Sequence, residues 1–382
     1  MLKRQICYRI FCIAVIISVI TFSGCKEPTS NSGAPKLTAS PKPVEDNDAK
    51  TKAVQLYVDA MMLRDLQRWD NAIMKLNNAI EISPDFSLAY SFKGDIHQLN
   101  KQYKISADSY EKATKIDPWS FQNFANLGKV SQIIKDYQRA VKAYVSACEL
   151  KTDDFEVHLG AGRCYYELED YELAFDYGQR AKEIKADKGQ ADVLIGDIYS
   201  ARSETFSANQ QVNQAKSVLV DATTAYKRAL EAEGNKPQIM VALAVTHTKY
   251  ALLLQNEKER KANFSFAEEL LNSALKKEPH NTKAYNTLGS VQLYLHNNLD
   301  AAFDCYTKAA GIEEKNWTTQ KGLGVVYMLK YMDAREIAIE QKTLAKLDDA
   351  LKQKAFKCWD VSLALNPDQP ELRNIYGGFK GE

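Results

Sequence analysis

Residues 121–188 read FQNFANLGKVSQIIKDYQRAVKAYVSACELKTDD and then FEVHLGAGRCYYELEDYELAFDYGQRAKEIKADK, two segments of equal length in one register. The step from Gly128 to Gly162 is the same as the step from Tyr137 to Tyr171. Small and aromatic residues at a fixed spacing of this length are typical of repeat proteins, in which each unit buries its apolar faces only by stacking on its neighbours. These two segments therefore predict an array of stacked repeats.

The same register continues in both directions along the chain. The small-residue position recurs at Ala60, Gly94 and Gly196, and the aromatic position recurs at Trp69 and Tyr103. A further series keeps the same step: Ala79, Ala113, Ala147 and Ala181. Pro84 and Pro118 form another. Several independent series with one period exclude a generic helical bundle and indicate one repeated unit.

Each unit contains two stretches of helical apolar periodicity separated by a short turn. Gly128 in the first stretch and Ala140 and Ala147 in the second are small enough to let two helices approach closely. Asp117-Pro118 ends a second helix, because the residue before proline avoids the helical region. The sequence thus predicts an all-α protein built of antiparallel helix pairs.

A period of about 34 residues with these residue types resembles the tetratricopeptide repeat (TPR) family, and the resemblance extends over residues 51–369. It implies a right-handed α-solenoid of about eight helix pairs. We place the unit starts near residues 53, 87, 121, 155, 189, 237, 282 and 317. Units one to four (51–186) are regular, units five to eight (187–369) contain insertions, and residues 370–382 are expected to cap the array.

The fifth, sixth and eighth units are longer than the others. The extra residues include the stretches SETFSANQQVNQAKSV, LLLQNEKERKAN and YMDAREIAIEQKTLAK. These stretches are polar and compatible with helix, so they predict either extended helices or loops that protrude at one edge of the array.

The N-terminus has the features of a secretory signal. Lys3, Arg4 and Arg9 precede an uncharged run from Ile10 to Phe22, and this run is too short to span a membrane. Residues 22–25 (FSGC) resemble a bacterial lipobox, which implies a signal peptide over 1–24 and acyl chains on Cys25. The alternatives are an uncleaved signal anchor and an ordinary signal with a chance cysteine. Residues 25–50 are rich in Pro and Ser and predict a flexible linker.

The resemblance to lipoproteins places the chain in the bacterial cell envelope, attached by lipid. By analogy with enterobacterial lipoproteins, Lys26 after the cysteine implies the outer membrane, facing the periplasm. The formal net charge of +1 gives no electrostatic reason to expect nucleic acid as a partner.

No pattern of catalytic or metal-binding residues is found in the sequence. No two of the five histidines lie three or four residues apart, and neither HExxH nor GxSxG occurs. We therefore expect no enzyme activity, no cofactor, no metal and no small-molecule substrate. Cys148 and Cys164 come from neighbouring units, and either a disulfide or two buried thiols fits the sequence.

In the TPR family the first helices line a concave groove that holds a peptide or protein partner. The resemblance assigns the groove to the second, fifth, ninth and twelfth positions of each unit. The residues at such positions that we single out are Tyr57, Met61, Arg64, Gln122, Lys129, Gln132, Glu156, Arg163, Tyr166, Lys283, Asn286 and Ser290. Tyr57 and Met61 replace the Lys and Asn that begin the carboxylate clamp of chaperone-binding members, so this clamp is not expected.

These features together favour a membrane-anchored scaffold or adaptor for protein–protein interactions in the bacterial envelope. Assembly of a secretion, pilus or outer-membrane complex is the expected setting. The alternative is a non-catalytic subunit or chaperone of an envelope enzyme complex, either a redox or a peptidoglycan-remodelling one. Both hypotheses predict a protein or peptide in the groove and a membrane contact through the lipid.

Overall fold

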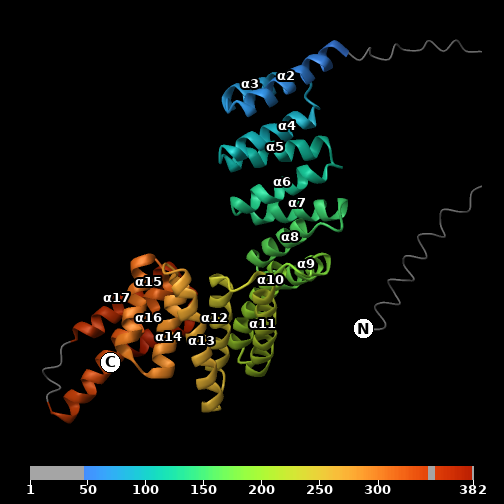
Figure 1. Cartoon of the computed structure of the whole chain (residues 1–382). Helices are drawn as coiled ribbons and strands as arrows, with labels where there is room; N and C mark the ends of the chain where they lie inside the picture. Colours follow the sequence, from blue (N-terminus) through green and yellow to red (C-terminus); the bar gives the residue numbers. More distant parts are fainter. Residues whose placement is uncertain (1–46, 343–348, 381–382) are drawn as a thin grey trace, which may run out of the picture. The chain divides into compact units, whose positions relative to one another are not determined.

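The computed structural model describes residues 47–342 and 349–380, which form α-helices joined by short turns, without a strand (Figure 1). The prediction of an all-α solenoid of helix pairs is confirmed. The helices are α2 (Asn47–Asp65), α3 (Trp69–Ile82), α4 (Ser87–Leu99), α5 (Tyr103–Ile116), α6 (Phe121–Ile133), α7 (Tyr137–Leu150), α8 (Phe155–Glu167), α9 (Tyr171–Ile184), α10 (Gly189–Ala208), α11 (Val212–Glu233), α12 (Pro237–Leu252), α13 (Glu257–Lys277), α14 (Thr282–His296), α15 (Leu299–Ile312), α16 (Trp317–Glu340), α17 (Ala350–Leu365) and α18 (Pro370–Lys380).

The predicted signal peptide, Cys25 and most of the predicted linker lie outside the described residues. Helix α2 begins at Asn47, so residues 47–50, which we expected to belong to the linker, are helical. The described part therefore starts directly with the first helix of the array.

In the described part of the chain, consecutive helices from α2/α3 to α16/α17 form pairs, and the second helix of each pair up to α15 also packs on the first helix of the next pair. In one such contact, Tyr144 and Ala147 of α7 form a buried cluster with Val157 and Cys164 of α8. Because every unit uses its neighbours to bury its apolar faces, the core runs along the array and not around one centre.

A tyrosine from the second helix of the same unit lies against most glycines of the series, whereas Gly162 lies against Leu194 of the next unit. A Cβ atom added to Gly128 would come within 2.7 Å of the Tyr144 ring, and one added to Gly196 would come equally close to Tyr226. Gly94 and Gly289 have the same relation to Tyr110 and Tyr306. Only glycine leaves room for this ring between the two helices of a unit.

In units one to four, the turn between the two helices contains a residue in the left-handed region. Gln67, Lys101, Lys135 and Glu169 have φ values from 58° to 61° and recur with the period of the repeat. A left-handed residue after the first helix reverses the chain in a few residues. Here this residue is never glycine, although glycine adopts the conformation at lower cost.

The extra residues of units five, six and eight lengthen helices. Helices α10 and α11 have 20 and 22 residues, whereas α8 and α9 have 13 and 14. Helix α13 has 21 residues and α16 has 24. Of the two forms that the sequence left open, extended helices account for most of the added chain; residues 343–348 of the eighth unit lie outside the described residues.

Helix α18 covers the end of the array. Leu372 is buried, and the Tyr376 ring lies 5.0 Å from Phe356 and 6.0 Å from Trp359, between ring centroids. This contact shields Trp359, which is itself 1% exposed. Helix α18 thus covers the apolar side chains of α17.

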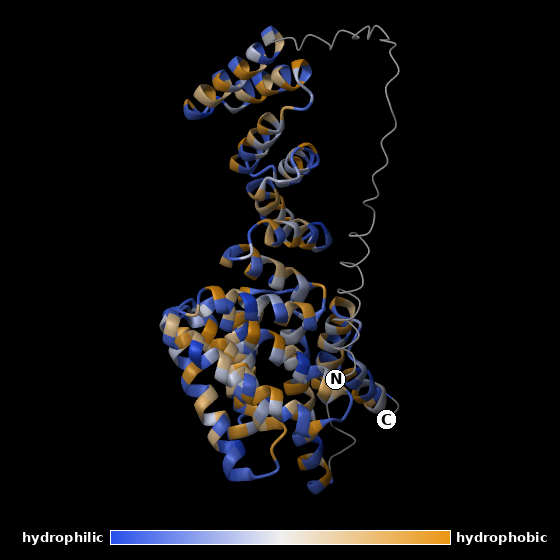
Figure 2. Ribbon diagram, turned by 90° about the vertical axis from the view of Figure 1, so that its right-hand side faces the viewer, coloured by the Kyte–Doolittle hydropathy of each residue, from blue (hydrophilic) through white to orange (hydrophobic). Residues whose placement is uncertain are grey.

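Each helix shows both hydrophilic and hydrophobic residues along its length (Figure 2). No helix among the described residues combines the length and the apolar character that crossing a membrane requires. Cys148 and Cys164 are both buried and both free, so the two-thiol interpretation holds in this structure.

Candidate functional site

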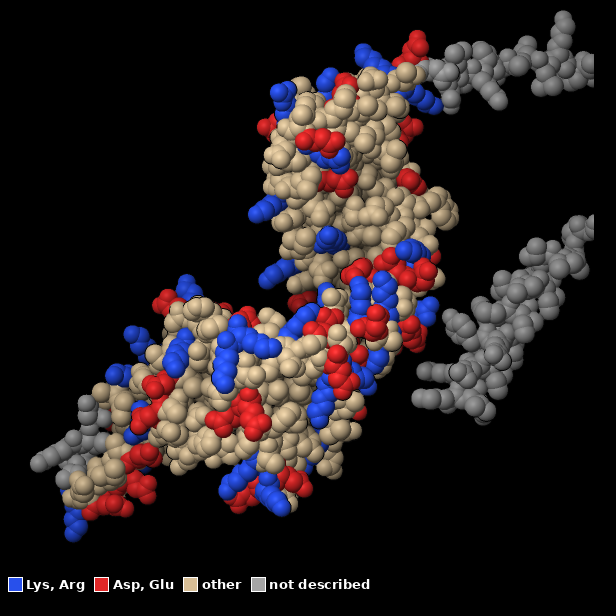
Figure 3. All heavy atoms as spheres, viewed as in Figure 1, with Lys and Arg blue, Asp and Glu red and all other residues tan. Residues whose placement is uncertain are grey.

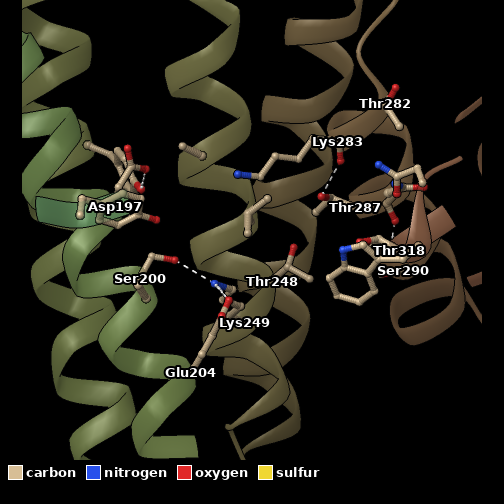
Figure 4. A pocket seen from close by; sticks show the side chains of 18 of the residues that line it. Asp197, Ser200, Glu204, Thr248, Lys249, Thr282, Lys283, Thr287, Ser290 and Thr318 are labelled. Carbon is tan, nitrogen blue, oxygen red and sulfur yellow. Dashed lines mark hydrogen bonds and ion pairs between the residues drawn. The ribbon is translucent and has the colours of Figure 1, made fainter. Parts of the chain in front are cut away.

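A hollow of about 740 Å³ opens along the first helices of units five to eight. Its walls come from α10, α12, α14 and the start of α16, and Tyr166 of α8 borders one end. Figure 4 shows these walls, with Asp197 on one side and Thr287 and Ser290 on the other. The lining combines aromatic rings, hydroxyls, amides and charged groups, which suits recognition of an extended polar chain.

Asp197 lies on the α10 wall and is held from behind by the second helix of its own unit. The Tyr226 hydroxyl donates to Asp197 Oδ1 over 2.6 Å. Burial raises the pKa of Asp197, and the Tyr226 hydrogen bond and the positive charges of Lys283, Arg163 and Lys249 oppose the rise. The net pKa shift is upward, so the ionised carboxylate is disfavoured by desolvation despite three nearby cations.

Lys249 joins the α12 wall to the α10 wall. Its ammonium donates to Ser200 Oγ over 2.9 Å and to Glu204 Oε1 over 2.6 Å. In Figure 4 these three side chains lie close together beside α10 and α12. The contact links α12 to α10. The charge of Lys249 is already paired with a carboxylate of the same chain.

The α14 wall carries the predicted residues Lys283, Asn286 and Ser290. Asn286 is buried and accepts a hydrogen bond from Thr319 Oγ1 over 2.9 Å. Ser290 Oγ lies 3.0 Å from the Tyr306 hydroxyl. Lys283, in contrast, is exposed, and its side chain extends across the hollow toward the Asp197 side (Figure 4).

A second hollow of about 360 Å³ adjoins the first on the side of units three and four. Gln132, Arg163 and Tyr166 line it, and Tyr166 and Asp197 border both hollows. Gln132 also accepts a hydrogen bond from the Tyr144 hydroxyl over 3.1 Å. The structure therefore brings six predicted residues from three units to one continuous surface.

The other six predicted residues lie elsewhere. Tyr57 packs on Phe86 and Phe92, and the Arg64 guanidinium lies 5.1 Å from the centre of the Phe92 ring, so both stabilise the contact between units one and two. Met61 is exposed on α2. The remaining three are exposed: Gln122 and Lys129 on α6, and Glu156, which forms an ion pair with Lys188.

Several residues of the larger hollow were not predicted from the sequence. Asp197 and Ser200 are the ninth and twelfth residues of the fifth unit, and Thr248 is the twelfth residue of the sixth. The same positional rule, applied to these two enlarged units, would have found them. Lys249 and Trp317 do not occupy those positions, and only the structure places them at the site.

Charged groups of both signs are interspersed over the face seen in Figure 3, with wide uncharged areas between them. In the part of the chain that the structure describes, no group of three or more His, Cys, Asp or Glu side chains is arranged to hold a metal ion. The lining of the two hollows consists of side-chain donors, acceptors and aromatic rings.

Comparison with protein families finds tetratricopeptide repeats in two segments, residues 88–118 and 126–191. A third family, the plant-specific mitochondrial import receptor subunit TOM20, matches residues 199–323. None of these matches covers half of the chain. No curated protein matches the sequence.

Among solved structures, the chain is similar to a tetratricopeptide repeat protein from Parabacteroides merdae, with 11% identity and a TM-score of 0.50 over 72% of this chain and 99% of that one. It is also similar to the C-terminal part of a TPR repeat-containing protein from Cytophaga hutchinsonii, with 13% identity and a TM-score of 0.49 over 70% and 99%. The first likeness supports the fold alone. The family matches indicate tetratricopeptide repeats in residues 88–118 and 126–191, and the likeness to this structure supports an all-α solenoid of helix pairs for the described residues.

Proposed function

We propose that this tetratricopeptide-repeat protein is a membrane-anchored scaffold that docks a partner protein in the groove formed by α10, α12, α14 and α16. The observation that carries the proposal is the continuous surface across units three to eight, on which the larger hollow alone measures about 740 Å³. A surface shared by so many separate helices suits an extended segment that contacts one unit after another.

The chemistry of the lining supports a protein ligand. Tyr166, Tyr171 and Trp317 offer amphipathic rings of the kind that dominate protein interfaces. Thr248, Thr287 and Ser290 add hydroxyls that can bond to a peptide backbone. Rings for affinity and short polar side chains for orientation are the combination expected of a recognition surface.

We also propose that the protein is attached to a membrane. An acylated Cys25 would hold the chain at a membrane, and several acyl chains on one residue anchor a protein stably. The part of the predicted linker that precedes α2, residues 25–46, would span roughly 25 Å as a flexible chain, so the groove could reach partners near the membrane surface. We propose that this membrane belongs to a bacterial envelope and that the partner belongs to a secretion, pilus or outer-membrane assembly.

Photo-crosslinking in intact cells tests this function. A photoreactive amino acid placed at Thr287, on the wall of the groove, is expected to crosslink to a specific protein. The matched control is Glu269, which is exposed on the second helix α13 and does not line the groove. A partner captured equally well from both positions, or from neither, would contradict the proposal.

A further inference from the structure

The carboxylates that line the two hollows already have donors within the protein. The donors are Tyr226 for Asp197, Lys249 for Glu204, Asn316 for Glu313, and Tyr137 for Glu167. A carboxylate that already accepts hydrogen bonds from its own chain has less to gain from a cationic ligand. These contacts hold the carboxylates in place from within the protein, and Lys249 also balances the charge of Glu204.

Most cations that line the same two hollows, in contrast, have no ion-pair partner among the described carboxylates. Lys249 is held by Glu204 and Ser200, but Lys135, Arg163 and Lys283 form no ion pair with any described carboxylate. All three are exposed. Arg163 and Lys135 line the smaller hollow, and Lys283 lines the larger one. Exposed cations without an ion pair are thus present in both hollows.

Asp197 lies between these two positive positions, because it borders both hollows. The positive charges of Lys283 and Arg163 both act on this carboxylate, although neither side chain forms an ion pair with it. A negative group placed directly at Asp197 would be repelled, whereas a neutral donor could share its oxygens. The pattern along the surface is therefore cation, acceptor, cation.

We infer that the groove selects an acidic peptide segment in which two carboxylates flank a neutral residue. One carboxylate pairs with Arg163 and Lys135, and the other pairs with Lys283. A hydrogen-bond donor between the two carboxylates contacts Asp197. This inference rests on the proposed function and names the ligand chemistry of that groove. Carboxylates are the natural partners of both Arg and Lys, and Arg can bind them through two parallel hydrogen bonds.

A display selection tests the inference before any natural partner is identified. The probe is a random 12-residue peptide library, selected on the full-length chain at about physiological salt, where ion pairs are screened over roughly 8 Å. The wild type is expected to enrich peptides with two Asp or Glu residues separated by neutral ones. Enrichment of peptides without this acidic pair would overturn the inference and leave a peptide-binding groove. Enrichment of no peptide would overturn the proposed function as well.

Charge reversal gives the second arm of the test. The double variant Arg163→Glu/Lys283→Glu changes two exposed side chains, and circular dichroism verifies that the helices are retained. An acidic peptide from the first selection is expected to bind this variant at least about tenfold more weakly, because two attractive contacts become repulsive. The matched control is Lys276→Glu, an exposed lysine on the second helix α13, which should leave the affinity unchanged. Equal loss in the control, or no loss in the double variant, would contradict the assignment.

Discussion

The hydroxyl of Tyr226 donates to Oδ1 of Asp197 over 2.6 Å and so links the second helix α11 to the groove face of the first helix α10. The equivalent Tyr110 donates to Asp95, and the hydroxyl of the equivalent Tyr306 lies 3.0 Å from Ser290 Oγ. The side chains that hold a unit together therefore also fix polar groups on the same face of its first helix.

Replacing Asp197 with Asn removes a carboxylate whose pKa is raised by burial while retaining an acceptor for Tyr226. The folded wild type holds its proton more tightly than the unfolded chain, so the wild type loses stability as pH rises above about 4. We therefore expect the difference in free energy of unfolding, Asp197→Asn minus wild type, to increase with pH. Its slope should stay below about 1.4 kcal/mol per pH unit. Urea titrations of both proteins at several pH values measure this difference. A relative stability that falls with rising pH would show that Lys283, Arg163 and Lys249 outweigh the desolvation.

Gly128→Ala tests the contact between glycine and tyrosine inside a unit. The new methyl would come within 2.7 Å of the Tyr144 ring, and overpacking of this kind should lower the free energy of unfolding by about 1–3 kcal/mol. The control is Gly311→Ala on α15, where no atom lies within 4 Å of the added Cβ and helix propensity should give a gain of up to about 1 kcal/mol. Calorimetry of both variants checks the prediction, which fails if they shift the melting temperature in the same direction.

Lys101→Gly should stabilise the second unit. Lys101 has a φ of 59°, a conformation that glycine adopts without the clash of a Cβ atom. We expect the free energy of unfolding to rise by about 0.5–1 kcal/mol. Lys112→Gly, at an exposed position inside α5, should lower it by about 1 kcal/mol. A lower urea midpoint for Lys101→Gly would mean that the lysine side chain contributes more than its backbone conformation costs.

Cys25→Ala tests the proposed anchor. If acyl chains on Cys25 hold the protein at a membrane, the variant should move to the soluble fraction after cell lysis and ultracentrifugation. Cys358→Ala, a change inside the helical array, should leave the protein in the membrane fraction. Continued membrane retention of the Cys25 variant would refute a lipid anchor at this residue.

Much of the fold could be predicted from the spacing of a few residues. The positions of Gly94, Gly128 and Gly196 mark the space that a tyrosine ring needs between two helices of a unit, and this space recurs in units two, three and five. The left-handed turns could not be predicted in the same way, because Lys101 and Lys135 occupy positions where glycine would have been the signal. The sequence also did not determine whether the extra residues of units five, six and eight lengthen helices or form loops, because a polar composition is compatible with both.

The candidate site was predicted less completely than the fold. The positional rule found Arg163, Tyr166 and Lys283, because these units keep a recognisable register. It also assigned Tyr57 and Arg64, which instead pack on Phe92 of the next unit. The position of a residue within a repeat determines on which face of the helix its side chain lies. It does not determine whether a neighbouring ring will cover that side chain, and this depends on contacts between units that the sequence does not show.

Amide hydrogen exchange of the full-length chain, with and without a peptide enriched by the display selection, tests the central claim most directly. We propose that the first helices of units five to eight form the binding surface. This proposal predicts that saturating peptide slows exchange in α10, α12 and α14 more than in their partners α11, α13 and α15. Slowed exchange confined to the second helices, or no change at saturation, would contradict it.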